Sequence, residues 1–259
     1  MKRVVNSLMF IVLAVFIACS NPPNKEKISE PILQEISKAD QIIEASIQAH
    51  GGELYNKAHY QFTFRGNLYR FKTNKAAFEY EFKGLNKDGD SIHTLLTQNK
   101  VQVWMNNAKL ELNEKQKMSY SDNLNSVIYF ATLPHKLGDY SVNKVYEGKT
   151  TIFNKTYEVI KVTFKQDGGG TDFDDEYYYW INAETMLIDY LAYKFHTNGG
   201  GIRFRVAYHP VKVEGIHFQD YVNYKVEVGT ALKKLPFLYE KGMLQELSRI
   251  ETENIIQIN

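Results

Sequence analysis

The chain has 259 residues, with 31 Lys and Arg against 30 Asp and Glu and a formal net charge of +1. This even balance, without any stripe of basic residues, argues against a nucleic-acid-binding surface, and no nucleic-acid partner is expected. Aromatic residues are frequent, with 18 Tyr, 15 Phe and 2 Trp, whereas there are only 6 Pro. Because Tyr and Phe favour half-buried pleated surfaces, the composition predicts a mainly antiparallel β protein with a few helices.

Residues 1–18 have the layout of an export signal. Lys2 and Arg3 precede an apolar run from Leu8 to Ala18, and the run stops at Cys19. Such a run is too short for a helix to cross the ~30 Å hydrocarbon core of a bilayer, so a permanent transmembrane segment is not expected. We predict that residues 1–18 are a signal peptide.

Cys19 is the only cysteine, so it cannot form an internal disulfide. The sequence Phe16-Ile17-Ala18-Cys19 resembles the lipobox of bacterial lipoproteins, although Phe16 replaces the usual Leu. The resemblance implies that Cys19 carries lipid and anchors the protein in the cell envelope, with the outer membrane, on its periplasmic or surface face, as the expected location. Residues 19–36 would then be the lipidated cysteine and a polar, flexible tether. The alternative is a plain secretory signal followed by a chance cysteine.

Residues 37–259 are predicted to form a single domain, because no Pro- or Ser-rich linker interrupts them. The apolar residues from Ser37 to His50 follow helical spacing, with Ser37 as the cap and Gly51-Gly52 as the end. From His59 the pattern changes to a period of two, which predicts a run of short strands. A second helix is expected from Glu114 to Leu133, before Pro134.

Strands resume from Asn143 to Val226, and a last helix is predicted from Leu235 to Glu253. Its expected apolar face consists of Leu238, Met243, Leu244, Leu247 and Ile250. Short strands joined by tight turns indicate a curved antiparallel sheet or half-open β-barrel covered by a few helices.

Several segments resemble a group of uncharacterised lipoproteins of the Bacteroidota. They are Ala49-His50-Gly51-Gly52 and the segments 164–170, 179–181, 189–193, 199–205 and 218–221. That family has no established activity, so the resemblance assigns no residue a role. The layout is also distantly similar to the LolA and LolB lipoprotein-carrier fold, in which helices form a lid over an apolar cavity. Trp180-Ile181-Asn182-Ala183-Glu184-Thr185 is similar to the strand and polar turn of that superfamily.

Large rings alternate along the predicted strands in both halves of the chain. Seven of them are candidates for the wall of an apolar ligand-binding groove: Phe62, Phe64, Tyr69, Tyr80, Tyr177, Tyr179 and Tyr193. The helix around Leu124 to Leu133 would act as its lid. The alternative is that these rings simply fill a core against the helices.

Two triple-glycine segments are expected at hairpin tips. Gly168-Gly169-Gly170 precedes Asp172 and Asp174, and Gly199-Gly200-Gly201 precedes Arg203 and Arg205. If the hairpins are neighbours, these charges could form an ion-pair patch at the rim or, alternatively, a polar ligand site. The acidic spacing does not match an EF-hand, and the histidines lack zinc-like spacing, so no metal is predicted. His50 is a further rim candidate, although a packed or capping histidine is the alternative for its place on the first helix.

These patterns favour a non-enzymatic, lipid-anchored protein that binds a lipid or an acylated protein in an apolar groove, without a cofactor. No Gly-x-Ser-x-Gly elbow, P-loop or dinucleotide fingerprint is present. Two alternatives stay open. One is an envelope hydrolase with a polar site at the glycine-rich rim, and the other is a structural or interaction lipoprotein that docks a partner at a sheet edge.

Overall fold

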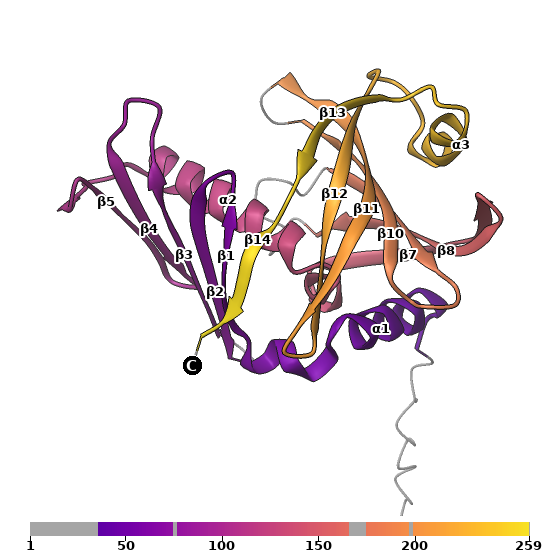
Figure 1. The fold of residues 1–259 in the computed structure, drawn as a ribbon, viewed down its shortest axis with the longest axis horizontal. Helices are drawn as coiled ribbons and strands as arrows, with labels where there is room; N and C mark the ends of the chain where they lie inside the picture. Colours follow the sequence, from indigo (N-terminus) through magenta and orange to yellow (C-terminus); the bar gives the residue numbers. More distant parts are fainter. Residues whose placement is uncertain (1–35, 75–76, 166–174, 197–198, 259) are drawn as a thin grey trace, which may run out of the picture. The chain divides into compact units, whose positions relative to one another are not determined.

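The computed structural model describes residues 36–74, 77–165, 175–196 and 199–258. Within these residues the strands form two seven-stranded antiparallel sheets, and neither sheet closes on itself (Figure 1). The predicted mainly antiparallel β class with a few helices is confirmed. The strands are divided between two open sheets that helices cover.

The first sheet has the order β14-β1-β2-β3-β4-β5-β6. Its strands are β1 (His59–Phe64), β2 (Asn67–Asn74), β3 (Ala77–Leu85), β4 (Ser91–Thr97), β5 (Lys100–Met105), β6 (Ala108–Lys109) and β14 (Glu253–Gln257). The second sheet has the order β13-β12-β11-β10-β9-β8-β7. Its strands are β7 (Val142–Ile152), β8 (Lys155–Phe164), β9 (Glu176–Asn182), β10 (Ile188–Phe195), β11 (Gly201–Val213), β12 (Ile216–Val226) and β13 (Gln245–Ile250).

Helix α1 (Lys38–His50) begins and ends where the sequence predicts. The side chain of Ser37 accepts a hydrogen bond from the main-chain N of Asp40, which satisfies one of the free amides of the first turn. Gly51 ends the helix at φ 136°, and a Cβ at this position would lie 3.2 Å from the Cα of Ile216. Glycine therefore lets the helix end pack directly on the start of β12, before the short helix η1 (Gly52–Lys57).

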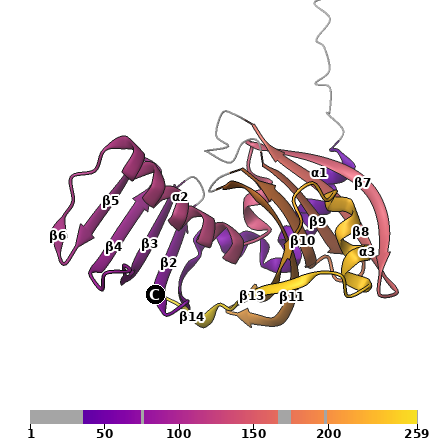
Figure 2. The same ribbon diagram turned by 90° about the horizontal axis from the view of Figure 1, so that it is seen from above.

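Helix α2 (Glu114–Ala131) lies along one face of the first sheet (Figure 2). A capping box opens it, in which Asn113 and Gln116 exchange hydrogen bonds between side chain and main chain. Only Leu124 and Ile128 are buried among its 18 residues. A short helix, η2 (His135–Gly138), follows it and leads into β7.

Beneath α2 the first sheet carries a ladder of rings. The register places Tyr60 opposite Phe71 and Phe62 opposite Tyr69, and the ladder continues into β3 through Tyr80. Side chains alternate between the two faces of a strand, so these rings share one face and form a single cluster with Leu124 and Ile128.

The second sheet is covered on both faces. Tyr177, Tyr179 and Ile181 of β9 belong to the cluster that contains the buried residues of α1. Tyr178 and Trp180 point to the other face, where they pack with Leu232 of η5 (Leu232–Lys234) and Leu235 of α3 (Leu235–Glu240). In Figure 1, α1 and α3 lie against this sheet and α2 lies against the other.

The predicted helix from Leu235 to Glu253 is wrong beyond Glu240. Lys241 caps α3, and Gly242 takes φ 65°, a value that suits the residue just past a helix end. Residues 245–250 then form β13, and the chain crosses to the first sheet within two residues to form β14. Pairing with the two free sheet edges overrides the helical spacing of the apolar residues, and Met243 and Leu247 are exposed.

Candidate ligand site between the two sheets

A pocket of about 180 Å³ lies where α2 meets the strands of both sheets that flank the β13–β14 crossing. Its wall is made by residues of β1, α2, β11, β12 and the β13–β14 segment. They are Phe62, Phe64, Arg65, Ser126, Val127, Phe130, Ala131, Arg205, Gln219, Tyr221, Asn223, Ile250 and Thr252. We call this space the junction pocket.

One side of the junction pocket is apolar. Phe62 and Phe64 project from β1 on the face that α2 covers, and Phe62 stacks on Tyr69 with 5.5 Å between ring centroids. Val127, Phe130 and Ala131 face them from the last turns of α2, and Ile250 closes the wall from β13. Period-two spacing on the strand and helical spacing on α2 therefore bring rings and aliphatic groups together here.

The other side of the pocket holds a buried arginine. Arg205 on β11 is 8% exposed, and its Nη2 donates a hydrogen bond of 2.8 Å to the hydroxyl of Tyr193. Its Cζ lies 3.8 Å from the centre of the Phe130 ring, which is a close cation–π contact. Its Nε has no hydrogen-bond partner among the described residues. The guanidinium therefore has N–H groups that no described residue accepts.

Two side chains of β12 continue this polar side. The hydroxyl of Tyr221 accepts a hydrogen bond of 2.7 Å from Nε2 of Gln219. Burial raises the pKa of Tyr221 to about 12, although the Gln219 hydrogen bond and the charge of Arg205 both oppose the rise. Asn223 donates to Ser248 Oγ at 3.3 Å, while its Oδ1 is buried without a partner among the described residues. The neutral phenol and this amide therefore both present polar atoms beside Arg205.

The predicted groove residues fall into two groups. Phe62 and Phe64 line the junction pocket, and Tyr69 and Tyr80 pack behind them in the cluster beneath α2. Burial raises the pKa of Tyr80 far above its usual range.

The other predicted groove residues, Tyr177, Tyr179 and Tyr193, lie on the face of the second sheet that α1 and the end of α2 cover. Tyr179 is fully buried, and its hydroxyl lies 2.8 Å from that of Tyr129 on α2. Tyr193 reaches the pocket only through its hydrogen bond with Arg205.

His50 lies in the interior and not at a rim. It is 1% exposed, its Nδ1 lies 2.8 Å from the carbonyl oxygen of Ser46, and its ring packs edge-on to His217 at 5.2 Å. Burial lowers the pKa of His50 to about 4, against the opposing effect of the Ser46 hydrogen bond. The neutral ring acts as a packed core residue next to the helix end.

Gly168-Gly169-Gly170 lies outside the described residues, but the strands that follow it and precede Gly199-Gly200-Gly201 are neighbours, because β9 pairs with β10 and Glu176 lies opposite Lys194. Asp175 and His196 meet between them, with 3.3 Å between Oδ1 and Nδ1. Arg203 donates to the carbonyl of Ile202 and lies over the ring of Phe195. Cys19, Asp172 and Asp174 lie outside the described residues.

Sequence reasoning did not assign Tyr221 and Asn223 to a site. A period-two signal was available, since residues 219, 221 and 223 alternate along one strand and share a face. Ile250 was placed on a helix, so its approach to Phe62 and Phe64 was not foreseeable from the pattern alone.

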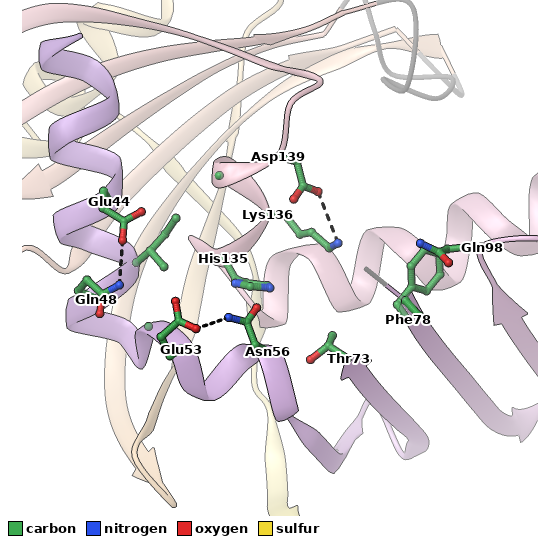
Figure 3. Close-up of a pocket in the computed structure, with 14 residues that line it drawn as sticks. Glu44, Gln48, Glu53, Asn56, Thr73, Phe78, Gln98, His135, Lys136 and Asp139 are labelled. Atoms are coloured by element: carbon green, nitrogen blue, oxygen red, sulfur yellow. Dashed lines mark hydrogen bonds and ion pairs between the residues drawn. The ribbon is translucent and has the colours of Figure 1, made fainter. Parts of the chain in front are cut away.

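A second, polar pocket of about 470 Å³ lies between α1, η1, η2 and the tips of β2 and β3 (Figure 3). Its charged groups are engaged locally: Gln48 donates to Glu44, Asn56 donates to Glu53, and Lys136 pairs with Asp139. His135 stacks on the buried ring of Tyr55 at 4.5 Å. Burial and the charge of Lys136 lower the pKa of His135. In the described parts of the chain, no three His, Cys, Asp or Glu side chains are placed to hold a metal ion.

Among the described residues, no helix has the length and hydropathy needed to cross a membrane. The profile of a family described as "Family of unknown function (DUF6503)" matches residues 31–252, which is most of the chain. The chain belongs to this family. No curated protein matches it. Membership of the DUF6503 family assigns no activity to the junction pocket or to the polar pocket.

Solved structures with similar topology share little sequence with this DUF6503 chain. A LolA superfamily protein from Nitrosomonas europaea matches with a TM-score of 0.48 and 10% identity, over 86% of this chain and 95% of the other. A DUF1329 family protein from Desulfovibrio piger matches with a TM-score of 0.41 and 10% identity, over 86% and 94%.

Proposed function

We propose that this protein is a non-enzymatic, lipid-anchored component of the cell envelope that binds a hydrophobic ligand in the junction pocket. The observation that carries the proposal is the apolar wall formed by Phe62 and Phe64 on one side and by Val127, Phe130 and Ile250 on the other. Such a wall beside a few polar groups is typical of small-molecule sites.

The size of the pocket limits what can enter it. Its volume of about 180 Å³ lies below the range of roughly 300–1,000 Å³ that is usual for sites of drug-sized ligands. At about 30 Å³ for a water-sized group, it accepts roughly six CH₂ groups. The ligand is therefore the end of a single acyl chain, from a lipid or an acylated protein, and not a whole phospholipid.

The affinity expected from this burial is modest. Six CH₂ groups at about 0.8 kcal/mol each contribute roughly 5 kcal/mol, which corresponds to a dissociation constant of about 0.2 mM before the costs of association. A longer chain would need more room, which α2 can provide as a lid. Only Leu124 and Ile128 of this helix are fully buried, whereas Val127, Tyr129, Phe130 and Ala131 are partly buried against the two cores.

The anchor would be Cys19, acylated after removal of residues 1–18, and residues 19–36 would connect it to the folded body. Acylation would place the protein at the outer membrane, where acyl chains are the abundant apolar ligands. Two or more chains on one residue give stable attachment, because each buried CH₂ contributes about 0.8 kcal/mol.

A pocket-filling substitution tests the proposal. Val127→Trp places an indole in the junction pocket, whereas Asn125→Trp puts the same ring on an exposed position of the same helix. We expect Val127→Trp to lose binding of 1-octanol at least about tenfold, because the ring occupies the space of the chain, and Asn125→Trp to bind as the parent does. Both variants carry Cys19→Ser, so that no attached acyl chain competes, and binding is followed by NMR titration. Equal binding by the two variants, or none by the parent, would exclude the junction pocket as the site.

A further inference from the structure

Among the described residues, Arg205 is a buried cation without a counter-charge. Its guanidinium has five N–H donors, yet within this part of the chain only one hydrogen bond, to Tyr193, engages it. Among the described residues no carboxylate lies within ion-pair distance of it. Asp220, on the adjacent strand β12, is engaged by Nδ1 of His209 at 2.9 Å and by the main-chain N of Thr252 at 2.8 Å. A buried charge in a folded protein normally has a partner, because its desolvation is otherwise unfavourable.

The groups around Arg205 are arranged to receive an anion. Its Nε is buried without a partner among the described residues, and Arg205 is one of the side chains that line the junction pocket. Tyr221 accepts from Gln219, so its own O–H is left to donate into the same space. Asn223 donates to the hydroxyl of Ser248, and its free Oδ1 is an acceptor, so Asn223 adds no donor for the anion.

We infer that the ligand of the junction pocket is an amphiphile with a carboxylate head, bound by Arg205 and Tyr221, and an apolar tail against Phe62, Phe64 and Val127. This inference rests on the proposed function and specifies its ligand class. The planar guanidinium matches a carboxylate through parallel N–H···O bonds, and the rest of the pocket volume is left for a short apolar tail.

If Arg205 is kept for a ligand, its replacement should not lower the thermal stability of the protein. When a buried arginine is paired within the chain, its removal leaves an uncompensated charge and is strongly destabilising. An arginine kept for a ligand has no such partner, so Arg205→Met, which retains much of the side-chain volume, should unfold at the same temperature as the parent or higher. Stability that is given up for binding is a common property of functional sites.

The experiment compares three probes on the full chain with Cys19→Ser: octanoate, 1-octanol and acetate. We expect octanoate to bind at least about tenfold more tightly than 1-octanol, since a hydrogen bond to a charged group contributes more than one to a neutral group. Acetate, which lacks the tail, should bind at least about tenfold more weakly than octanoate. Arg205→Met should abolish the preference for octanoate over 1-octanol and keep the binding of 1-octanol.

Arg203 provides the matched control, because it lies on the same strand two residues away, does not line the junction pocket, and is engaged by the carbonyl of Ile202 and the ring of Phe195. Arg203→Met should keep the preference for octanoate. Equal binding of octanoate and 1-octanol by the parent would overturn the inference and leave the proposed function intact, whereas no binding of either would overturn both. Tight binding of acetate would instead indicate a site for small anions. A large loss of thermal stability in Arg205→Met, with no octanoate preference in the parent, would show that the chain itself supplies the counter-charge.

Discussion

The two sheets have the same number of described strands but are covered very differently. The second sheet packs against α1 on one face and against η5 and α3 on the other, so both of its faces are core. Among the described residues, one face of the first sheet is covered, by α2 together with Tyr55 of η1 and Phe218 of β12. Its other face carries Glu81 in contact with Arg70, Lys83 and His93 at 2.7–3.0 Å. Within this part of the chain, only one face of the first sheet therefore contributes to a core.

The helix α1, on the second sheet, is also more deeply buried than the helix α2, on the first sheet. Six of the 13 residues of α1 are buried, against two of the 18 residues of α2. Burial of apolar side chains supplies most of the free energy that holds a helix on a sheet. We call the second sheet with α1 the scaffold, and we expect α2, which has fewer fully buried residues, to be the helix that opens more readily. The junction pocket lies at the boundary between these two regions.

The largest expected effect comes from deleting one core ring in each region. Phe204, on the α3 face of the second sheet, and Phe71, in the cluster that includes Leu124 and Ile128 of α2, are both fully buried. Phe204→Ala should lower the free energy of unfolding by about 3–5 kcal/mol, and Phe71→Ala by an amount near the lower end of that range, because the cluster around Phe71 is closed partly by α2, which can shift toward the space. Urea unfolding of the two variants measures the difference. A larger loss in Phe71→Ala would mean that α2 is held as rigidly as the scaffold.

Acid should weaken the packing of His50 before it weakens the Glu81 cluster of the first sheet. Burial lowers the pKa of His50 to about 4, whereas an unfolded histidine titrates near 6.5. The unfolded chain therefore binds the extra proton first, and stability is lost as the pH falls from about 6.5 to about 4. A difference of about 2.5 units amounts to roughly 3 kcal/mol. Protonation would place a charge on buried Nε2 beside His217.

The Glu81 cluster of the first sheet loses its contribution to stability at lower pH. Burial alone would raise the pKa of Glu81, but Lys83, Arg70 and His93 outweigh it and lower that pKa. The stability that this carboxylate contributes is present above its unfolded pKa of about 4.3 and is lost only as the pH falls below that value. Urea unfolding at pH 7, 5.5 and 4.5 should show a flatter pH dependence in His50→Gln than in the parent. Identical slopes in His50→Gln and in the parent would remove His50 as the cause.

Features that depend on local contacts could be predicted from the sequence, whereas features that depend on distant contacts could not. The ends of α1 were predictable because Ser37 and Gly51 act on their own helix. The aromatic alternation located one face of each strand, but it could not identify the element that covers this face. Tyr177 and Tyr179 were therefore grouped with Phe62, although α1 and the end of α2 cover them.

The misassigned carboxyl-terminal helix has the same cause. Leu244, Leu247 and Ile250 fit helical spacing, yet residues 245–250 and 253–257 fill the free edges beside β12 and β1. Whether a segment becomes an edge strand depends on the strand with which it pairs. That partner strand lies outside any local window of the sequence. The position of Ile250 in the junction pocket depends on that pairing, so the pocket could not be derived before the two sheets were known.

The smallest expected effect separates the two helices most directly. Asn113→Ala removes the capping box of α2, and Ser37→Ala removes the cap of α1. Each cap is worth about 1 kcal/mol, so the two losses of helix stability should be similar. Their consequences should differ, because the buried residues of α1 hold it on the second sheet whatever its cap does. Amide hydrogen exchange should therefore accelerate along much of α2 in Asn113→Ala, but only in the first turn of α1 in Ser37→Ala. If exchange in α2 also changes only in the first turn, the helix is fixed by its contacts with the first sheet, and a ligand would have to enter the junction pocket without displacing it.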